Sequence, residues 1–308
     1  MGENKEACYI IINPHAGNGK GGKDWPLIES CLIKKNISYE FIFTGKKQHA
    51  IELSSVAADN GYKKIIAVGG DGTLNEVANG ILKSKKPSDV IIGIIPVGSG
   101  NDWCRMFGIP AVYDDAIKTI INKKVFIQDV GIVKCSNGNE IISRFFVNAA
   151  GLGFDAKVVQ KTNDQKDRGR SGKLLYLLNL FTSLFSYKVV EAEISIDDKK
   201  IKTKLFSMNV GICKYSGGGM MQVPNAVADD GLFDVTVINK IGKFDVIRNV
   251  KNLYDGSFIK HRKVDIYRGV KITVNAIPPV SVEVDGETLG HSPLEFSIIP
   301  HALKIISV

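Results

Sequence analysis

The chain of 308 residues is long enough for two domains, and its 44% hydrophobic and 23% charged residues are typical of a globular protein. Its five cysteines lie far apart with no C-x-x-C pair, which argues against a zinc site and a disulfide framework and fits a reducing cytosol. No run of about 18 apolar residues occurs, which excludes a membrane-spanning helix, and the net charge of +8 favours an anionic partner.

Up to about residue 130 the sequence alternates apolar strands with amphipathic helices. Strands are expected at residues 7–12, 38–44, 63–70 and 90–100. Helices are expected at residues 24–36, 49–60 and 74–83. This alternation predicts an α/β domain, a parallel sheet covered by helices on both faces.

After about residue 130 the pattern changes to short strands with period-2 alternation, separated by Gly, Asp and Asn. The expected strands are residues 124–135, 144–151, 188–197, 200–213, 231–239, 270–276, 280–287 and 294–299. Such alternation favours antiparallel pairing in a sandwich or barrel. We therefore predict an α/β domain over residues 1–131 and a β-rich domain over residues 132–308, whose last residues pack back on the first domain.

Three strands of the first domain run into glycine loops with polar residues, at 13–19, 69–76 and 96–102. Because the carboxyl ends of parallel strands meet at one edge of a sheet, these loops are expected to converge there. Glycine lets backbone N–H groups approach a ligand closely, and a helix that follows such a loop favours anions at its N-terminus. Asp71 and Asp102 add carboxylates for Mg²⁺. The loops match neither the P-loop nor the dinucleotide G-x-G-x-x-G pattern.

The motifs "NPHAG", "VGGDGTLNEV" and "PVGSGND" resemble those of the bacterial diacylglycerol kinase and lipid kinase family. Sphingosine and ceramide kinases are relatives of that family, and NAD kinases are more distant ones. The resemblance continues through "IQDVG", "NAAGLGFDA", "GGGMMQVPNAVADDGLFDV" and "VSVEVDGE", so it covers nearly the whole chain in order. It implies an α/β catalytic domain, a mostly antiparallel β-sandwich domain, and an ATP site in the cleft between them.

The resemblance implies ATP contacts at the glycine loops and at the end of the second strand. These residues are Asn13, Pro14, His15, Ala16, Gly17, Thr44, Gly70, Asp71, Gly72, Thr73, Leu74, Asn75, Glu76, Gly98, Ser99 and Asn101. Ser99 stands where many bacterial members have Thr, and its hydroxyl keeps the same hydrogen-bonding group.

The resemblance also implies the catalytic and metal-binding residues. Asp71, Asp102 and Asp129 would order Mg²⁺ and its waters, and Glu287 would act as the general base. A structural Mg²⁺ site would use three groups of the "ADDGLFD" loop: the backbone carbonyls of Val227 and Leu232 and the carboxylate of Asp230.

Each of these acidic residues also has an ordinary structural interpretation. Asp102 is a favoured helix N-cap, Asp129 lies at a strand end, and Asp285–Gly286 is a strong hairpin signal. Asp230–Gly231 is equally typical of a turn. A functional interpretation is favoured because the acidic turns occur together and in the order of the family.

The resulting hypothesis is an ATP- and Mg²⁺-dependent lipid kinase of phospholipid metabolism that converts diacylglycerol to phosphatidic acid. A sphingoid base, a ceramide or phosphatidylglycerol is an alternative acceptor, and an NAD kinase-like phosphotransferase is the runner-up. A third hypothesis is a catalytically silent nucleotide sensor or membrane-binding module. The intact Asp71, Asp129 and Glu287 argue against that third hypothesis.

Residues 174–190 are rich in Leu, Phe and Tyr and follow a basic stretch at 161–173, expected to be flexible. They are expected to form a helix that lines an acyl-chain pocket or lies on a membrane, or alternatively one that packs into the core. Nine Lys/Arg against three Asp in residues 240–271 fit a solvated helix face or an anionic membrane. We expect a cytoplasmic protein on the inner face of the membrane, a homodimer as in relatives, and no nucleic-acid partner.

Overall fold

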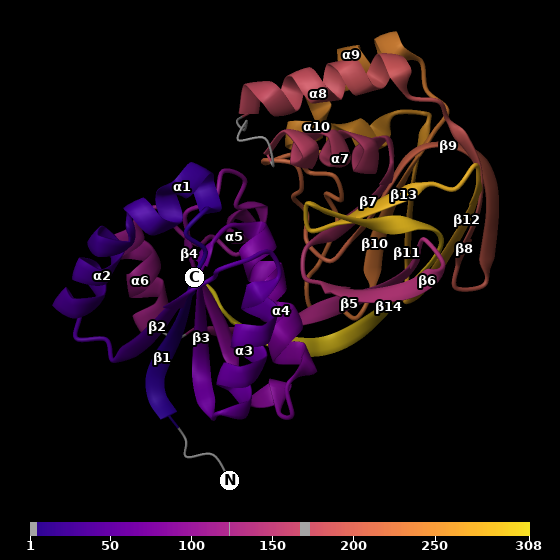
Figure 1. Ribbon diagram of the computed structural model, residues 1–308. Helices are drawn as coiled ribbons and strands as arrows, with labels where there is room; N and C mark the ends of the chain where they lie inside the picture. The colour runs from indigo at the N-terminus through magenta and orange to yellow at the C-terminus, as the bar shows by residue number, and fades with distance from the viewer. Residues whose placement is uncertain (1–4, 123, 167–172) are drawn as a thin grey trace. The chain divides into compact units, whose positions relative to one another are not determined.

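The computed structural model describes residues 5–122, 124–166 and 173–308, with the side chains of Lys5 and residues 166–177 left out. The chain divides into two compact units (Figure 1). Unit 1 comprises Met1–Gln128 together with His301–Val308, and unit 2 comprises Asp129–Pro300. The end of the chain therefore belongs to the same unit as its beginning.

Unit 1 contains a parallel sheet in the order β14, β4, β3, β1, β2. Its strands are β1 (Lys5–Ile12), β2 (Tyr39–Phe43), β3 (Tyr62–Gly69), β4 (Ile91–Pro96) and the end of β14 (Glu287–Ile306). β3 is buried almost throughout, as its run of apolar residues predicts for a strand covered on both faces. The predicted parallel sheet is confirmed.

Helices cover both faces of this sheet (Figure 1). They are α1 (Ala16–Lys23), α2 (Trp25–Lys34), α3 (His49–Asp59), α4 (Asp71–Lys83), α5 (Asp102–Met106) and α6 (Tyr113–Asn122). Trp25 and Ile28 of α2 and Ile117 of α6 pack on the same side of the strands, while α3 and α4 pack together on the other. α4 begins at Asp71, three residues before the predicted start at Leu74, so Gly69 ends β3, Gly70 is the extended N-cap, and Asp71 and Gly72 already belong to the helix.

Unit 2 is built of antiparallel strands with four helices among its described residues. Its strands are β5 (Val125–Asn137, which begins in unit 1), β6 (Glu140–Phe146), β7 (Ala149–Gly153), β8 (Val190–Ile196), β9 (Lys199–Gly211), β10 (Phe233–Asn239), β11 (Val264–Gly269), β12 (Lys271–Ile277), β13 (Ser281–Val284) and most of β14. Neighbouring strands pair in the order β11, β10, β9, β7, β13, β14. A second series of pairings also connects β9 with β14, because β9 pairs with β8, β8 with β12, and β12 with β14. Antiparallel pairing is thus confirmed.

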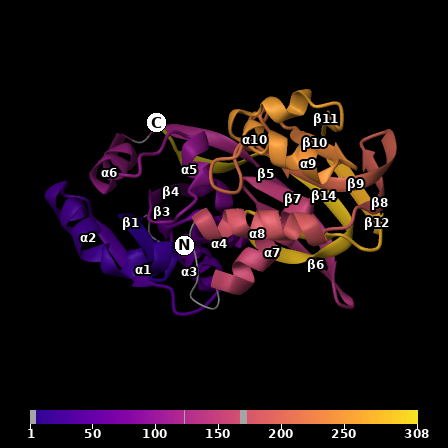
Figure 2. The same cartoon turned by 90° about the horizontal axis from the view of Figure 1, so that it is seen from above.

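The helices of unit 2 are α7 (Phe154–Lys166), α8 (Lys173–Ser186), α9 (Lys243–Asn249) and α10 (Asn252–Asp255). α7 and α8 lie side by side (Figure 1, Figure 2). Residues 161–166 belong to α7, Lys173 begins α8, and residues 167–172 lie outside the described residues, so the flexibility expected for this stretch stays a prediction. No helix among the described residues is both long enough and apolar enough to cross a membrane.

α8 has both a packed and an exposed face. Leu180 and Leu184 are buried against Phe154 and Phe206, whereas Phe185 is 61% exposed. Core packing thus holds for one side of this helix, and Phe185 lies on the other side, where contact with a membrane stays a prediction.

The predicted strand at 144–151 is interrupted, because a side chain takes the place of a neighbouring strand. The backbone N–H groups of Val147, Asn148 and Ala149 donate to the Asp285 carboxylate at 2.9, 3.0 and 3.0 Å. The chain therefore leaves β6 at Phe146 and re-enters the sheet as β7 at Ala149. Asp285 also forms the β13–β14 hairpin turn with φ +47°.

We expect Asp285→Asn to lower the free energy of unfolding by about 2–4 kcal/mol, because an amide offers fewer acceptor sites to three buried N–H groups. Asn tolerates positive φ as well as Asp does, so the change isolates the carboxylate. Chemical denaturation measures the loss. Asp198→Asn, in the exposed turn after β8, is the matched control and should change stability by no more than about 0.5 kcal/mol. Equal losses in the two variants would contradict the assignment.

Candidate functional site

The three glycine loops of unit 1 contact one another through their backbones. They follow β1, β3 and β4, which are parallel neighbours. A Cβ on Gly17 would lie 1.9 Å from the carbonyl oxygen of Val97, and one on Gly98 would lie 2.6 Å from the Cα of Gly70. The predicted convergence of the loops at the carboxyl edge of the sheet is confirmed.

Glycine serves different purposes in these loops. Gly17 and Gly19 have φ of +60° and +85°, the left-handed region that glycine adopts without strain. Gly70 has φ −113°, which any residue adopts, and a Cβ there would press on Gly98 Cα at 3.1 Å. Gly70 is therefore required for close approach and not for an unusual dihedral angle.

Asn13 connects the first loop to the second. Its side-chain amide donates to Thr73 Oγ1 at 3.0 Å, and its Oδ1 accepts from the backbone N–H of His15 at 3.0 Å. The backbone N–H of Asn13 donates to the carbonyl of Val68 at 3.0 Å. The first and second loops are thus held in one arrangement before any ligand binds, with His15 exposed.

The other predicted ATP contacts differ in accessibility. Leu74, Asn75 and Thr73 are buried, so their side chains lie beneath the surface of the loops, and Thr44 is also buried. Glu76 accepts from the backbone N–H groups of Gln48 and Ala50, so it caps the start of α3. The more open group comprises Pro14, Ala16, Gly72, Gly98, Ser99 and Asn101.

Asp71 and Asp102 lie together at the start of α5. Asp71 accepts from the backbone N–H of Asp102 at 3.2 Å and of Trp103 at 3.0 Å. The cap of α5 is therefore Asp71 of the second loop, and Asp102 does not cap its own helix. A Cβ on Gly100 would lie 3.2 Å from Asp71 Oδ2 and 3.7 Å from Asp102 Oδ2. Two carboxylates facing one glycine suit a hard cation such as Mg²⁺.

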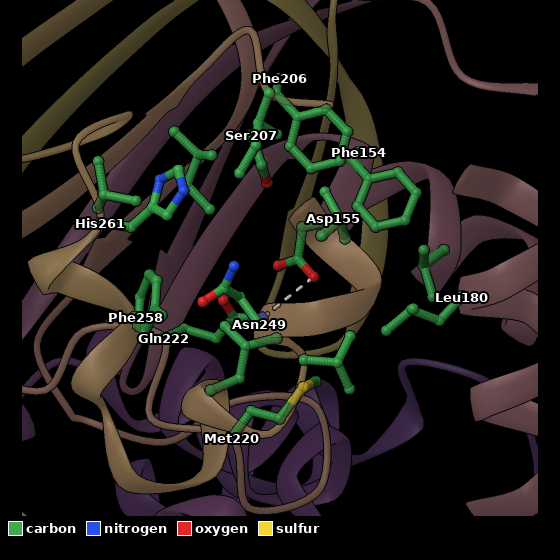
Figure 3. A pocket seen from close by; sticks show the side chains of 17 residues that line it. Phe154, Asp155, Leu180, Phe206, Ser207, Met220, Gln222, Asn249, Phe258 and His261 are labelled. Atoms are coloured by element: carbon green, nitrogen blue, oxygen red, sulfur yellow. Dashed lines mark hydrogen bonds between the residues drawn. The ribbon is translucent and has the colours of Figure 1, made fainter. Parts of the chain in front are cut away.

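Unit 2 contains an apolar pocket (Figure 3). The pocket is open to solvent, and the empty volume of about 690 Å³ includes that open space. Phe154 of α7, Leu180 of α8 and Phe206 of β9 form one wall, and Val246 of α9 and Phe258 lie among the remaining lining residues. The helix expected at residues 174–190 thus contributes Leu180 to an apolar pocket.

One end of the pocket is polar. Asp155, in the first turn of α7, lines it, and Gln222 Nε2 donates to Asp155 Oδ1 at 3.4 Å. Burial raises the pKa of Asp155 to about 6. Burial and the neighbouring charge of Asp155 raise the pKa of Glu283, which is fully buried on β13.

Comparison with known proteins identifies both parts of the chain. Residues 7–133 match the diacylglycerol kinase catalytic domain, and residues 148–307 match the YegS C-terminal NAD kinase beta sandwich-like domain. The chain belongs to the bacterial diacylglycerol kinase family.

Its relatives are similar over their whole lengths. A diacylglycerol kinase of Staphylococcus saprophyticus is 28% identical over 303 residues, covering 98% of this chain and 96% of the relative. A diacylglycerol kinase of Mycobacterium tuberculosis is 27% identical over 300 residues, covering 96% of this chain and 93% of the relative. The crystal structure of a protein named as a putative diacylglycerol kinase from Bacillus anthracis has the same fold, with a TM-score of 0.77, 23% identity, and coverage of 98% of this chain and 97% of that chain.

In this family member, Asp129 belongs to unit 2 and is bound to the D-D-G loop. It is fully buried, its Oδ2 accepts from the backbone N–H of Gly231 at 2.7 Å, and its own N–H donates to the carbonyl of Ala228 at 2.8 Å. The structure therefore brings Asp71 together with Asp102, and Asp129 together with the loop that contains Asp230.

At the predicted structural Mg²⁺ loop, a positively charged side chain of the protein already pairs with Asp230. The Arg268 guanidinium of β11 pairs with Asp230 and lies 3.3 Å from Asp234 Oδ2. Asp230 Oδ1 also accepts from the backbone N–H of Leu232 at 3.1 Å. Mg²⁺ at the predicted site would therefore compete with the Arg268 guanidinium for Asp230, and the site formed by Asp230 with the carbonyls of Val227 and Leu232 stays a prediction.

Sequence reasoning missed Arg268, Asp155 and Glu283. Asp155 belongs to the motif "NAAGLGFDA", directly after an expected strand. In "VSVEV" the alternation puts Glu283 on the polar side with Ser281, so no pattern in the sequence signals its burial. Arg268 carries no signal either, since it lies in a segment with eight other basic residues.

We expect Arg268→Gln to show a larger MgCl₂-dependent rise in melting temperature than the wild type, in which the Arg268 guanidinium pairs with Asp230. Removing the guanidinium frees two carboxylates for a cation that binds only the folded state. Differential scanning calorimetry with MgCl₂ titrations measures the difference. Arg268→Gln combined with Asp230→Asn controls for Mg²⁺ bound elsewhere. A Mg²⁺-dependent rise in the wild type that Asp230→Asn abolishes would show that the metal displaces Arg268.

Proposed function

We propose that this chain is an ATP-dependent lipid kinase that transfers the γ-phosphate of ATP to a lipid hydroxyl, with diacylglycerol as the first candidate acceptor and phosphatidic acid as its product. The observation that carries the proposal is the backbone contact between the three glycine loops, with Asp71 and Asp102 beside them. The apolar pocket of unit 2 supports a lipid acceptor. The names of the curated relatives agree with this assignment.

In this proposal the loops bind the phosphates of ATP through backbone N–H groups, and the open residues Gly17, Gly72 and Ser99 allow that approach. Asp71 and Asp102 would hold Mg²⁺, which neutralises charge on the phosphates when bound. Phosphoryl transfer has a loose transition state, so positioning and charge stabilisation supply most of its acceleration. The hydrogen bonds that fix Asn13 and Asp71 hold their side chains in place beforehand.

Glu287 is proposed as the general base. It begins β14 directly after the turn that Asp285 holds with three hydrogen bonds, so it stands on a rigid support. It would accept the proton of the lipid hydroxyl as that oxygen bonds to the γ-phosphorus and the bond to ADP breaks.

We expect Glu287→Gln to lower the rate of lipid phosphorylation by about 10²–10⁴-fold, because Gln keeps the size of Glu but cannot accept the proton. ATP affinity should stay within about threefold of the wild type, since the base acts on the acceptor. The assay uses labelled ATP with diacylglycerol, sphingosine, ceramide and phosphatidylglycerol, and with NAD as a separate acceptor. Glu140→Gln, exposed on β6, is the control. Label on NAD alone would refute lipid kinase activity, and a fully active Glu287→Gln would refute the base.

Contact with an anionic membrane is proposed through the exposed ends of α8 and α9. Phe244 is 86% exposed and Phe185 is 61% exposed. Lys243 joins the two helices, because its Nζ donates to the carbonyl of Phe185 at 2.7 Å. Aromatic side chains beside basic ones fit the interfacial zone of an anionic bilayer.

We expect Phe244→Ser to reduce binding to phosphatidylglycerol-containing vesicles by about threefold or more, because an exposed aromatic ring loses its burial in the bilayer interface. Sedimentation with vesicles measures the bound fraction. Ile141→Ser, at a position on β6 that is 79% exposed, should leave binding unchanged. Equal losses in the two variants would remove the α8–α9 surface from the proposal.

A further inference from the structure

Two buried carboxyl groups, Asp155 and Glu283, meet beside the unit 2 pocket, which Asp155 lines. Asp155 is 7% exposed and Glu283 is 0% exposed. β13 pairs with β7 so that Glu283 stands opposite Gly151. A Cβ on Gly151 would lie 2.2 Å from Asp155 Oδ2 and 2.6 Å from Glu283 Oε1, so both oxygens crowd the same point above that glycine. Because Gly151 has no Cβ, the two carboxyl groups have space to meet above it.

One oxygen of each carboxyl group lacks a hydrogen-bond donor. Asp155 Oδ2 and Glu283 Oε1 have no hydrogen-bond partner among the residues that the structure describes. The other oxygens are engaged, since Gln222 Nε2 donates to Asp155 Oδ1 at 3.4 Å and the backbone N–H of Gly286 donates to Glu283 Oε2 at 2.8 Å. Buried polar atoms in native proteins nearly always have partners, so these two oxygens require an explanation.

The surrounding polar groups are already committed to other partners. Asn209 Nδ2 donates to Gln222 Oε1 at 3.3 Å, which fixes the amide that faces Asp155. Ser207 donates its hydroxyl proton to the carbonyl of Leu152 at 3.1 Å, so it does not serve Asp155. Figure 3 shows the Asp155 carboxyl directed into the pocket, between the Phe206 ring and Gln222.

Burial makes both carboxyl groups harder to ionise. It raises the pKa of Asp155 to about 6, and burial together with the charge of Asp155 raises the pKa of Glu283 well above its usual range. No described cation lowers the pKa of either group. Ionising both groups at once is therefore disfavoured, because no cation offsets two buried like charges.

We propose that Asp155, with Glu283 beside it, recognises the head of the amphiphile whose chain occupies this pocket, by accepting a hydrogen bond from a hydroxyl or ammonium proton. A donor on the ligand adds a hydrogen bond to a buried carboxyl group for which Gln222 supplies only a 3.4 Å contact. The apolar walls formed by Phe154, Leu180 and Phe206 suit the chain of the same molecule. A carboxylate or phosphate head is disfavoured there by like charge.

This inference rests on the proposed function only where it takes the amphiphile to be the phosphate acceptor. It then defines the acceptor class as a lipid whose head presents a proton donor to a buried carboxylate. It also separates two roles: Asp155 binds the head, while Glu283 is a positioning residue that acts through Asp155.

Equilibrium dialysis without ATP tests the recognition directly, with four probes that share one hydrocarbon chain: oleyl alcohol, oleylamine, methyl oleate and oleate. We expect the alcohol and the amine to bind the wild type about tenfold or more tightly than the methyl ester, which lacks a donor, and oleate to bind most weakly. Whether the amine or the alcohol binds more tightly identifies the kind of donor.

Asp155→Leu should bring the alcohol and the amine to the affinity of the ester while leaving ester binding within about threefold, because only the acceptor is lost. Glu283→Gln should retain the preference, because Asp155 keeps its acceptor oxygens and Gln keeps the size of Glu. Leu180→Ala is the matched control and should weaken all four probes by a similar factor. Asp155→Asn, which keeps the size of Asp, should lose the preference for the amine and serves if Asp155→Leu does not fold.

Equal affinity of the wild type for ester, alcohol and amine would overturn the proposal, and so would an Asp155→Leu variant that folds and still discriminates between them. A folded Asp155→Asn variant that still prefers the amine would also overturn the proposal. Because no ATP is present, this result is independent of kinase activity. A chain that phosphorylates no lipid can pass the dialysis test, and an active lipid kinase can fail it.

Discussion

A carboxylate removed from water must be given hydrogen-bond donors, and this requirement organises much of the structure. Asp285 receives three backbone N–H groups, and in doing so it ends β6 and starts β7. Asp71 receives two and thereby orients α5. Asp129 receives one from the D-D-G loop. In each case an acidic residue of a motif fixes backbone that is distant in sequence.

Asp155 and Glu283 depart from this rule, since each keeps an oxygen without a donor among the described residues. The departure occurs beside the apolar pocket, which Asp155 lines. Strain that a fold does not relieve internally tends to lie where a ligand relieves it. The contrast with Asp285, on the same hairpin and fully supplied with donors, makes the acid pair a candidate for recognition and Asp285 a structural residue.

The glycine loops of unit 1 follow a different physical logic. Parallel strands bring their carboxyl ends to one edge, and glycines let the backbones of three loops touch there. The family assignment supports a kinase, and the similarity to the Bacillus anthracis structure, at 23% identity, concerns the fold alone. The apolar pocket lined by Asp155 lies in unit 2 and differs in kind from these loops.

The sequence by itself determined the parallel sheet of the first part, the antiparallel strands of the second, the convergence of the three loops, and the family. These features depend on hydrophobic periodicity, on glycine and on motifs that are contiguous in the chain, so they are visible in one dimension. The sequence also indicated an apolar helix near residues 174–190, and Leu180 lines the pocket.

Only the tertiary structure decided which partner each acidic side chain has. Asp71 caps α5 across a separation of 32 residues, Asp285 meets Val147 across 138, and Arg268 meets Asp230 across 38. Hydrogen bonds and ion pairs depend on distances of a few ångströms between side chains, and long sequence separations leave no periodic trace of them. The same reason hid Glu283, whose meaning depends on the carboxylate that the fold places beside it.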